Sequence, residues 1–168
     1  MVEKPRVVAK PTAIVAADTS FLGNVSIGAG TVVHPRATID GRQAPVVVGD
    51  NCILEEQVTI TARGDRVFIG DGNSFRVGAT LDASNVGNCN QFEARSSVVG
   101  ADVHNFCAVG AGCTVTTDLA DRTVVYGSES LHREWSGYGV TQQLAEHAKH
   151  LEYLRDMIPA VHKLRVFY

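Results

Sequence analysis

Large apolar residues recur at a step of six residues along the first three quarters of the chain. Many of these repeats open with Ile or Val followed by Gly. The pairs are Ile27-Gly28, Val48-Gly49, Ile69-Gly70, Val86-Gly87, Val99-Gly100 and Val109-Gly110. Further apolar residues follow in the same step: Val33 and Ile39, Leu54 and Ile60, Phe75 and Leu81, Phe92 and Val98, and Val115. This step fits neither the period of an α-helix nor the alternation of a lone strand.

A six-residue repeat predicts short parallel strands folded around a triangular prism, with three hexapeptides in each coil. The large residue of each hexapeptide points into the prism, and a small or hydrogen-bonding residue four positions later lies near a corner. These corner residues are Thr31, Ala37, Cys52, Val58, Asn73, Asn90, Ser96 and Cys113. We expect Asn73 and Asn90 to stack on neighbouring coils and to bond the backbone of the turns. Glycine after the anchor suits a place where side-chain bulk is unwelcome.

The predicted fold is therefore an all-β solenoid, a left-handed parallel β-helix of hexapeptide repeats. Parallel crossovers are normally right-handed, so the left hand is taken from the resemblance to proteins built of hexapeptide repeats. Gly28, Gly49 and Gly70 are 21 residues apart instead of 18. This spacing predicts about three extra residues in two coils, at 41–45 and 62–66. The register also slips between Gly100 and Gly110, since ten is not a multiple of six.

The last part of the chain has the pattern of an α-helix. Residues 141–157 contain no Gly or Pro, and apolar residues recur at helical spacing. Thr141 is the predicted N-cap, and Pro159 is predicted to end or kink the helix. Residues expected to pack on the prism or to bind a partner are Leu144, Leu151, Leu154, Ile158, Leu164 and Phe167. We assign residues 1–127 to the β-helix, and 128–168 to a linker and a helix packed on the same domain.

Composition and charge fit one globular domain. The 168 residues are 45% hydrophobic and 20% charged, with a formal net charge of -3. Without a cluster of Lys and Arg, nucleic acid is not an expected partner. No apolar run approaches the roughly 18 residues of a membrane span, and no secretory signal is recognisable. We therefore expect a location in the cytosol. The four cysteines, none in a C-x-x-C pair, are predicted to be small apolar filler in the core in preference to a thiol or metal site.

Two histidines, His34 and His104, lie in the β-helix and are the candidates for catalysis. Hexapeptide β-helices include acyltransferases, which use a histidine as general base in a groove between subunits. They also include zinc hydratases, in which roughly three histidines must reach one ion. His104 has no histidine five residues away, where Val109 stands. The sequence therefore predicts no catalytic group, metal or cofactor. His147, His150 and His162 are expected to face solvent on the helix.

The chain resembles the dynactin subunit 6 family over roughly residues 7–166. The matching stretches are Val33-His34-Pro35-Arg36-Ala37-Thr38-Ile39, Val48-Gly49-Asp50-Asn51-Cys52-Ile53-Leu54-Glu55-Glu56-Gln57, Ile69-Gly70-Asp71-Gly72-Asn73-Ser74-Phe75-Arg76-Val77-Gly78, Val86-Gly87-Asn88-Cys89-Asn90-Gln91-Phe92-Glu93-Ala94 and Thr123-Val124-Val125-Tyr126-Gly127. Glu55-Glu56-Gln57 and the Val-Tyr-Gly exit to a helix are more specific than the hexapeptides themselves.

The resemblance implies a non-catalytic scaffold role. Members of the family pair with a second β-helix subunit and, with an actin-related protein, cap the pointed end of dynactin's actin-like filament. That end helps to link the dynein motor to cargo, which implies a location in the cytoplasm on the cytoskeleton. Exposed sheet edges at the solenoid ends are expected docking sites. The alternative is a hexapeptide-repeat acyltransferase acting as a homotrimer, with His34 or His104 as its base.

Overall fold

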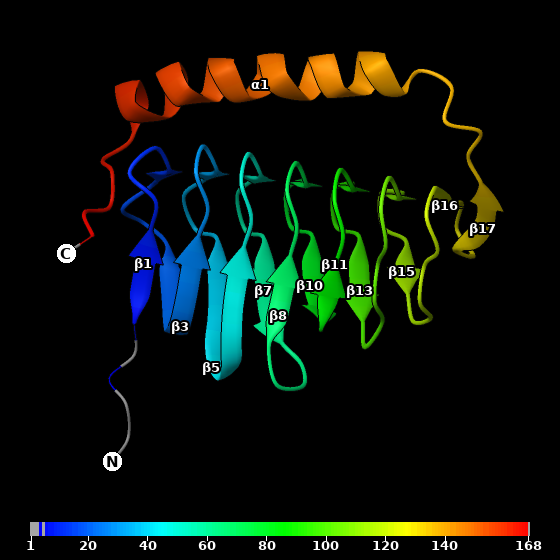
Figure 1. Cartoon of the computed structure of the whole chain (residues 1–168), viewed down its shortest axis with the longest axis horizontal. Coiled ribbons are helices and arrows are strands. Elements are labelled where there is room, and N and C mark those ends of the chain that lie inside the picture. The colour runs from blue at the N-terminus through cyan, green and yellow to red at the C-terminus, as the bar shows by residue number, and fades with distance from the viewer. Residues whose placement is uncertain (1–3, 5, 168) are drawn as a thin grey trace.

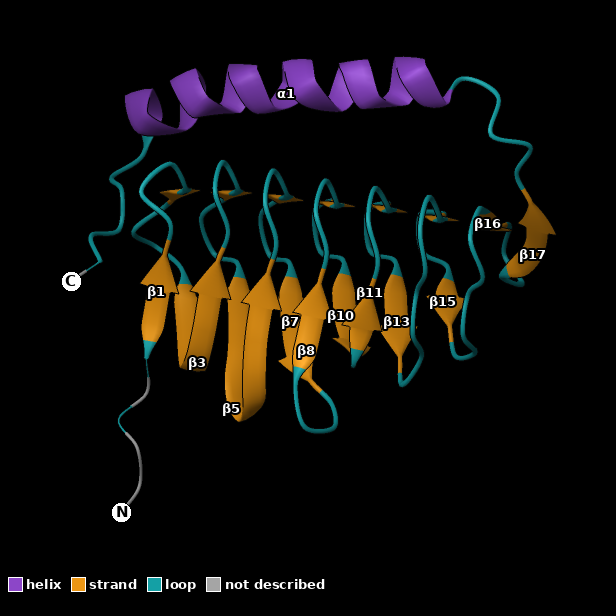
Figure 2. Cartoon of the chain, viewed as in Figure 1, coloured by secondary structure: helices purple, strands orange, loops and turns teal. Residues whose placement is uncertain are grey.

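Short parallel strands stacked in coils build the body of the molecule, and one long helix lies beside them (Figure 1). The computed structural model describes residue 4 and residues 6–167. The predicted fold class is confirmed: the chain is a left-handed parallel β-helix of hexapeptide repeats with a C-terminal α-helix packed on it. Figure 2 shows the strands in orange and the helix in purple, running the length of the solenoid.

The coils present three faces, which we name for what they carry. The helix face is formed by β2 (Ile14–Val15), β4 (Val32–Val33), β6 (Ile53–Leu54), β9 (Ser74–Phe75), β12 (Gln91–Phe92), β14 (Ala108–Val109) and β16 (Thr123–Tyr126). The hydroxyl face is formed by the first halves of β3 (Ser20–Ile27) and β5 (Thr38–Val48), with β7 (Thr59–Ala62), β10 (Thr80–Ala83), β13 (Ser97–Val99) and β15 (Thr114–Val115). The β8 face is formed by β1 (Val7–Ala9), the second halves of β3 and β5, β8 (Val67–Ile69) and β11 (Asn85–Val86).

The inward side of every coil is apolar. The predicted anchors Ile27, Val48, Leu54, Ile69, Val86 and Val109 are all buried in one continuous core. Phe75 and Phe92 stack inside it, with ring centroids 4.5 Å apart and planes 8° apart. The glycines after the anchors lie where successive coils approach closely. A Cβ added at Gly28, Gly49, Gly70, Gly87 or Gly110 would meet a main-chain oxygen of the next coil. Close stacking therefore explains the recurring Ile/Val-Gly pair.

The coil registers reproduce the predicted insertions. Val25 pairs with Val46 and Val46 with Val67, each 21 residues later. Residues 41–45 are not a loop, however, because they continue β5 as an extended arm, whereas 63–66 form a turn. These two segments project side by side below the solenoid in Figure 1.

The prediction that Val99-Gly100 anchors a repeat is wrong. Val86 pairs with Val103, and Val103 pairs with Leu119, so the next anchor after Val98 is Val103. Val99 is 45% exposed and points outward from the hydroxyl face. The chain passes from Val98 to Val103 in five residues because the turn at Gly100 is one residue shorter than in the regular repeat.

The helix α1 (Val140–Val161) starts and ends differently from the prediction. Its N-cap is Gly139, with φ 83°, and not Thr141. Glycine reaches this left-handed φ without strain, so the turn closes two residues earlier. Pro159 does not end the helix, which continues to Val161. Because Pro159 lies two residues before the end of α1, it disturbs only the last turn, and buried Ile158 packs that turn on the solenoid. Among the described residues, no helix is long and apolar enough to span a membrane.

Antiparallel segments of the same chain close both ends of the helix face. At the C-terminal end, β17 (Leu131–Glu134) pairs antiparallel with β16, inside the segment predicted to be a linker. At the N-terminal end, the Ala17 N–H donates to the Lys163 carbonyl at 2.7 Å, and the Arg165 N–H donates to the Val15 carbonyl at 2.8 Å. The tail therefore returns to the first coil, as Figure 1 shows at the end marked C. The division of the chain at residue 127 stays a prediction.

Candidate functional site

His34 lies directly after β4, between the helix face and α1. Its Nε2 is buried and has no hydrogen-bond partner among the described residues. Burial lowers the pKa of His34, while the carboxylates of Glu55 and Glu56 raise it and do not reverse the shift. The imidazole is therefore neutral at pH 7, as a general base must be. This nitrogen is nevertheless buried, so a substrate could not reach it in this conformation.

His147 and His150 face the solenoid, so the prediction that they face solvent is wrong. The His147 Nε2 lies 2.7 Å from the carbonyl oxygen of Asn51, and burial, followed by the Arg76 cation, lowers the pKa of His150. They lie on this side because helical spacing places them beside Leu151 and Leu154. A polar gap of about 340 Å³ separates this half of α1 from the coils. It is lined by Ser74, Arg76, Gln91, Gln143, Glu146, His147 and His150. His162 is exposed, as expected.

His104 stands alone on the outside of the solenoid, in a shallow hollow of about 350 Å³ on the β8 face. Its nearest acidic neighbours, Asp102 and Asp121, each accept a backbone N–H from the preceding coil. Both carboxylates are thus engaged in joining coils, and neither is hydrogen-bonded to the imidazole. Within the part of the chain that the structure describes, no group of three or more His, Cys, Asp or Glu could hold a metal ion.

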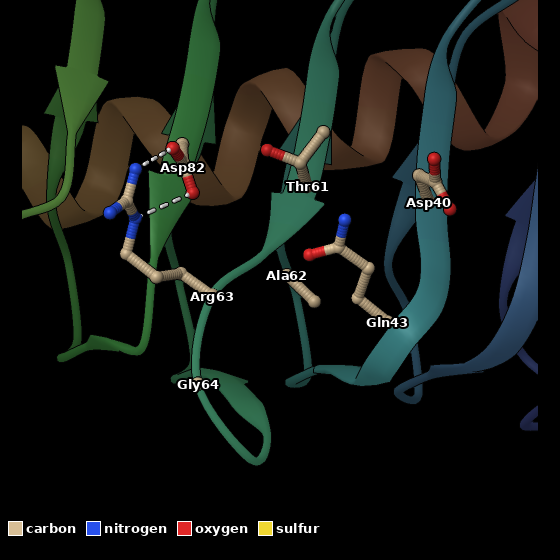
Figure 3. A pocket seen from close by; sticks show the side chains of 7 residues that line it. All are labelled: Asp40, Gln43, Thr61, Ala62, Arg63, Gly64 and Asp82. Carbon is tan, nitrogen blue, oxygen red and sulfur yellow. Dashed lines mark hydrogen bonds and ion pairs between the residues drawn. The ribbon is translucent and has the colours of Figure 1, made fainter.

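A polar hollow of about 450 Å³ lies on the hydroxyl face, beside the extended arm 41–45 and the turn 63–66 (Figure 3). It is lined by Asp40, Gln43, Thr61, Ala62, Arg63, Gly64 and Asp82. Arg63 binds Asp82 through two hydrogen bonds, of 2.6 and 3.1 Å. Arg42 binds Asp40 in the same manner, and these bonds hold the pKa of Asp40 below its ordinary value. Its charges are therefore paired within the chain, and no free base faces the hollow. The spacing of the glycines predicted the extra residues at 41–45 and 62–66, but the sequence analysis did not single out these ion pairs.

A ladder of side-chain donors runs along one inner corner of the prism. Each member donates to a main-chain carbonyl of the next coil. The bonds are Thr31 Oγ1 to Gly49 (2.7 Å), Cys52 Sγ to Gly70 (3.2 Å), Asn73 Nδ2 to Gly87 (2.8 Å), Asn90 Nδ2 to His104 (2.7 Å) and Cys107 Sγ to Ala120 (3.1 Å). Cys52 and Cys107 therefore act as weak donors as well as filler. Burial raises the pKa of Cys52 to about 12, so this thiol is unreactive.

A second ladder, of Asp and Asn, lies outside the same corner and was missed from the sequence. Each side-chain Oδ1 accepts the backbone N–H of a residue one coil earlier. The acceptors are Asp50, Asp71, Asn88, Asn105 and Asp121. The recurring Gly followed by Asp or Asn was its available signal. Both ladders use their polar groups to join coils, which marks this corner as a structural seam.

The predicted helix residues divide into three groups. Leu151, Leu154 and Ile158 are buried against Val32 and Ile53 of the helix face. Leu144 is 44% exposed, so it does not pack on the prism, and its use in partner binding stays a prediction. It is exposed because the coils opposite the first half of α1 carry polar Ser74 and Gln91.

The tail residues cover the first coil instead of standing free. Leu164 packs beside the helix cluster, and Phe167 packs against the main core. The Arg165 guanidinium lies over the Phe21 ring, 4.9 Å from its centroid. Tyr168 lies outside the described residues. Leu164 and Phe167, which were expected to pack on the prism or to bind a partner, thus pack on the solenoid of their own chain.

The chain is similar to proteins of one curated family and to solved structures of a broader fold. It is 33% identical over 167 residues to dynactin subunit 6 of Nematostella vectensis, covering 90% of this chain and 88% of that protein. It is 32% identical over 170 residues to dynactin subunit 6 of Danio rerio, covering 91% and 84%. No family model matches.

Among solved structures, a putative acetyltransferase of Bacillus cereus superposes with a TM-score of 0.82 at 16% identity, covering 91% of this chain and 92% of that one. A hexapeptide transferase family protein of Anaplasma phagocytophilum gives 0.81 at 15% identity, covering 90% and 92%. At these identities the likeness concerns the fold alone.

Proposed function

The chain belongs to the dynactin subunit 6 family, and on this premise we propose that it is a non-catalytic scaffold subunit of dynactin's pointed-end complex. In this role it pairs with a second hexapeptide β-helix subunit and is held near the actin-related protein at the pointed end. It thereby supports dynein-dependent linkage to cargo, in the cytoplasm and on the cytoskeleton.

The observation that carries this proposal is the extent of the similarity. The match to the Nematostella protein covers 90% of the chain, so it is not confined to a few hexapeptide repeats. Generic hexapeptides alone would not favour one member of this large fold over another.

The structure supports a scaffold role through its rigidity. The two ladders at one corner join successive coils by side-chain hydrogen bonds, and the core is continuous from the first coil to the last. Outward side chains are thereby held in fixed rows, which lowers the entropy lost when a partner docks.

The placement of the histidines supports a role without catalysis. The Nε2 of His34 is buried, and the carboxylates nearest His104 are engaged with the backbone. Replacing both histidines by alanine is expected to leave assembly into the complex intact. The measurement is recovery of complex components with the tagged double variant, compared with the wild-type chain at equal expression.

The test of the proposal itself is affinity purification of the tagged chain from its own cells, followed by mass spectrometry. Recovery of a second hexapeptide subunit with an actin-related protein and other dynactin components is the expected result. Recovery of the chain alone as a homotrimer would contradict the proposal. It would instead favour an acyltransferase, the alternative that the shared fold keeps open.

A further inference from the structure

Much of the solenoid surface is already covered by the chain itself. Helix α1 lies over the helix face, and its apolar stripe is buried on the first three coils. The tail pairs with β2 of the first coil and β17 pairs with β16 of the last, so the edge of the helix-face sheet is covered at both ends. End-to-end stacking of a second solenoid on the helix-face sheet would have to displace one of these segments. A partner can therefore reach the coils from the side, across the hydroxyl face or the β8 face.

The hydroxyl face offers little to anchor a partner. Its central outward row consists of small hydroxyl residues, namely Ser20, Thr38, Thr59, Thr80, Ser97 and Thr114. The row beside it consists of Leu22, Asp40, Thr61, Asp82 and Val99, and the charges of Asp40 and Asp82 are paired with Arg42 and Arg63. Interface energy is usually concentrated in a few buried aromatic or Arg anchors, and these rows contain no aromatic residue.

The β8 face has an aromatic residue at its centre. The pairing register places Val8, Ser26, Val47, Phe68 and Asn85 in one outward row. Phe68, the fourth residue of that row, is 48% exposed, and it is the most exposed of the six phenylalanines. The Arg66 guanidinium lies 5.5 Å from its ring centroid. This stacking orients the ring before any partner arrives.

Charge changes sign along the same face. Lys4 and Arg6 lie at its first coils, where they line a hollow of about 610 Å³ beside Val8 and Ser26. Asp102 and Asp118 continue the row at its last coils, since Val86 pairs with Val103 and Val103 with Leu119. The face therefore runs from the cations Lys4 and Arg6, through Phe68 with Arg66 stacked on it, to the anions Asp102 and Asp118.

We propose that the β8 face is the surface that receives the second hexapeptide β-helix subunit, with Phe68 as its central anchor; this rests on the proposed function. The partner's facing side is flat, apolar opposite Phe68, acidic opposite Lys4 and Arg6, and basic opposite Asp102 and Asp118. A second solenoid fits because its coils repeat at the strand spacing of about 4.8 Å, so its rows meet these rows coil by coil. Opposite charges at the two ends fix the direction in which the two solenoids lie together.

The direct test places a photo-crosslinking amino acid, p-benzoylphenylalanine, at position 68 of the tagged full-length chain in its own cells. Irradiation is expected to join position 68 to the second hexapeptide subunit. The matched control carries the same group at position 80, on the hydroxyl face, and is expected to give no such adduct. An adduct of position 68 with a second copy of this chain or with the actin-related protein would overturn the proposal. So would an adduct with the second hexapeptide subunit from position 80 alone.

Two sets of variants test the anchor and the charges. Phe68→Ser is expected to reduce recovery of the second hexapeptide subunit by about tenfold or more. The double variant Lys4→Glu with Arg6→Glu is expected to reduce this recovery more at low salt than at high salt, because salt screens the charges. The control Tyr153→Ser removes a side chain of similar exposure, 56%, from the outside of α1 and is expected to change nothing. Thermal unfolding checks that each variant is folded.

The two proposals fail in different ways. If the wild-type chain recovers no second hexapeptide subunit, the proposed function fails. If the wild-type chain recovers it and folded Phe68→Ser does so equally well, the proposed function stands and the assignment of the β8 face is wrong.

Discussion

At the scale of single residues, one structural task is performed by three different side chains. Thr31, Cys52, Asn73 and Asn90 occupy equivalent inner-corner positions and donate to the next coil's carbonyl. This position requires a small side chain whose donor group reaches a main-chain carbonyl of the next coil. A hydroxyl, a thiol and an amide all meet this requirement. The oxygens of Thr31, Asn73 and Asn90 also accept a backbone N–H from a residue in the following coil.

Asn90→Leu is expected to lower the free energy of unfolding by about 2–4 kcal/mol. The buried amide accepts the Cys107 N–H at 2.7 Å and donates to the His104 carbonyl at 2.7 Å, and leucine would leave both groups unpaired. Chemical denaturation measures the change. Cys107→Thr is the control, since Thr31 makes the same bond at the equivalent position, and a loss under about 1.5 kcal/mol is expected there. Equal losses in the two variants would refute the importance of the amide.

His34 predicts a pH dependence of stability. Its folded-state pKa lies below the ordinary 6.5, chiefly because the imidazole is buried. Above pH 6.5 the imidazole is neutral in the folded and in the unfolded chain, so it does not lower the free energy of unfolding. Below pH 6.5 the unfolded chain takes up the proton more readily, so stability falls as the pH drops toward the folded-state pKa. The free energy of unfolding should therefore decrease less between about pH 7.5 and pH 5 in His34→Gln than in the wild type. Identical pH profiles would contradict this account.

At the scale of elements, α1 consists of two halves held in different ways. The second half buries Leu151, Leu154 and Ile158 against apolar outward residues of the first three coils. The first half stands over Ser74 and Gln91 and encloses the polar gap containing His147 and His150. Where α1 packs firmly thus depends on the outward residues of the helix face as well as on the sequence of the helix itself.

Leu151→Asp and Leu144→Asp form a matched pair that tests this division. The first substitution places a charge in the buried stripe and is expected to cost about 3 kcal/mol or more of the free energy of unfolding. The second lies at an exposed position on the same helix and is expected to change it by no more than about 0.5 kcal/mol. Thermal and urea unfolding measure both. Similar losses would mean that the first half is also packed.

At the scale of the whole molecule, the chain returns to its own beginning. The segment after α1 adds backbone hydrogen bonds to β2, and Arg165 also donates to the Thr19 carbonyl at 3.1 Å. An exposed edge of a parallel sheet is a ready template for association. The tail covers that edge and so limits end-to-end stacking of solenoids.

Deleting residues 163–168 is expected to destabilise the fold and to cause concentration-dependent association. The deletion uncovers the β2 edge and the Phe21 ring, which Arg165 covers. Light scattering coupled to gel filtration measures the mass across a range of concentrations. Val166→Ser, at an exposed tail position, should leave both stability and mass unchanged. A truncated chain that stays monomeric and equally stable would show that the tail does not protect the end.

The sequence determined the solenoid, because each coil is a local six-residue pattern whose inward residues had to be large and apolar. It also determined the 21-residue coils and the buried part of the helix stripe. It misplaced Val99, because an anchor is defined by pairing with the coils on either side, and a one-residue change in a turn is invisible to a fixed period. It misjudged the N-cap, Pro159 and the helix histidines, because these depend on how α1 sits on the solenoid. Only the tertiary structure decided that the tail covers the first coil and that Phe68 lies at the centre of an open face, since both result from contacts or registers that link distant parts of the chain.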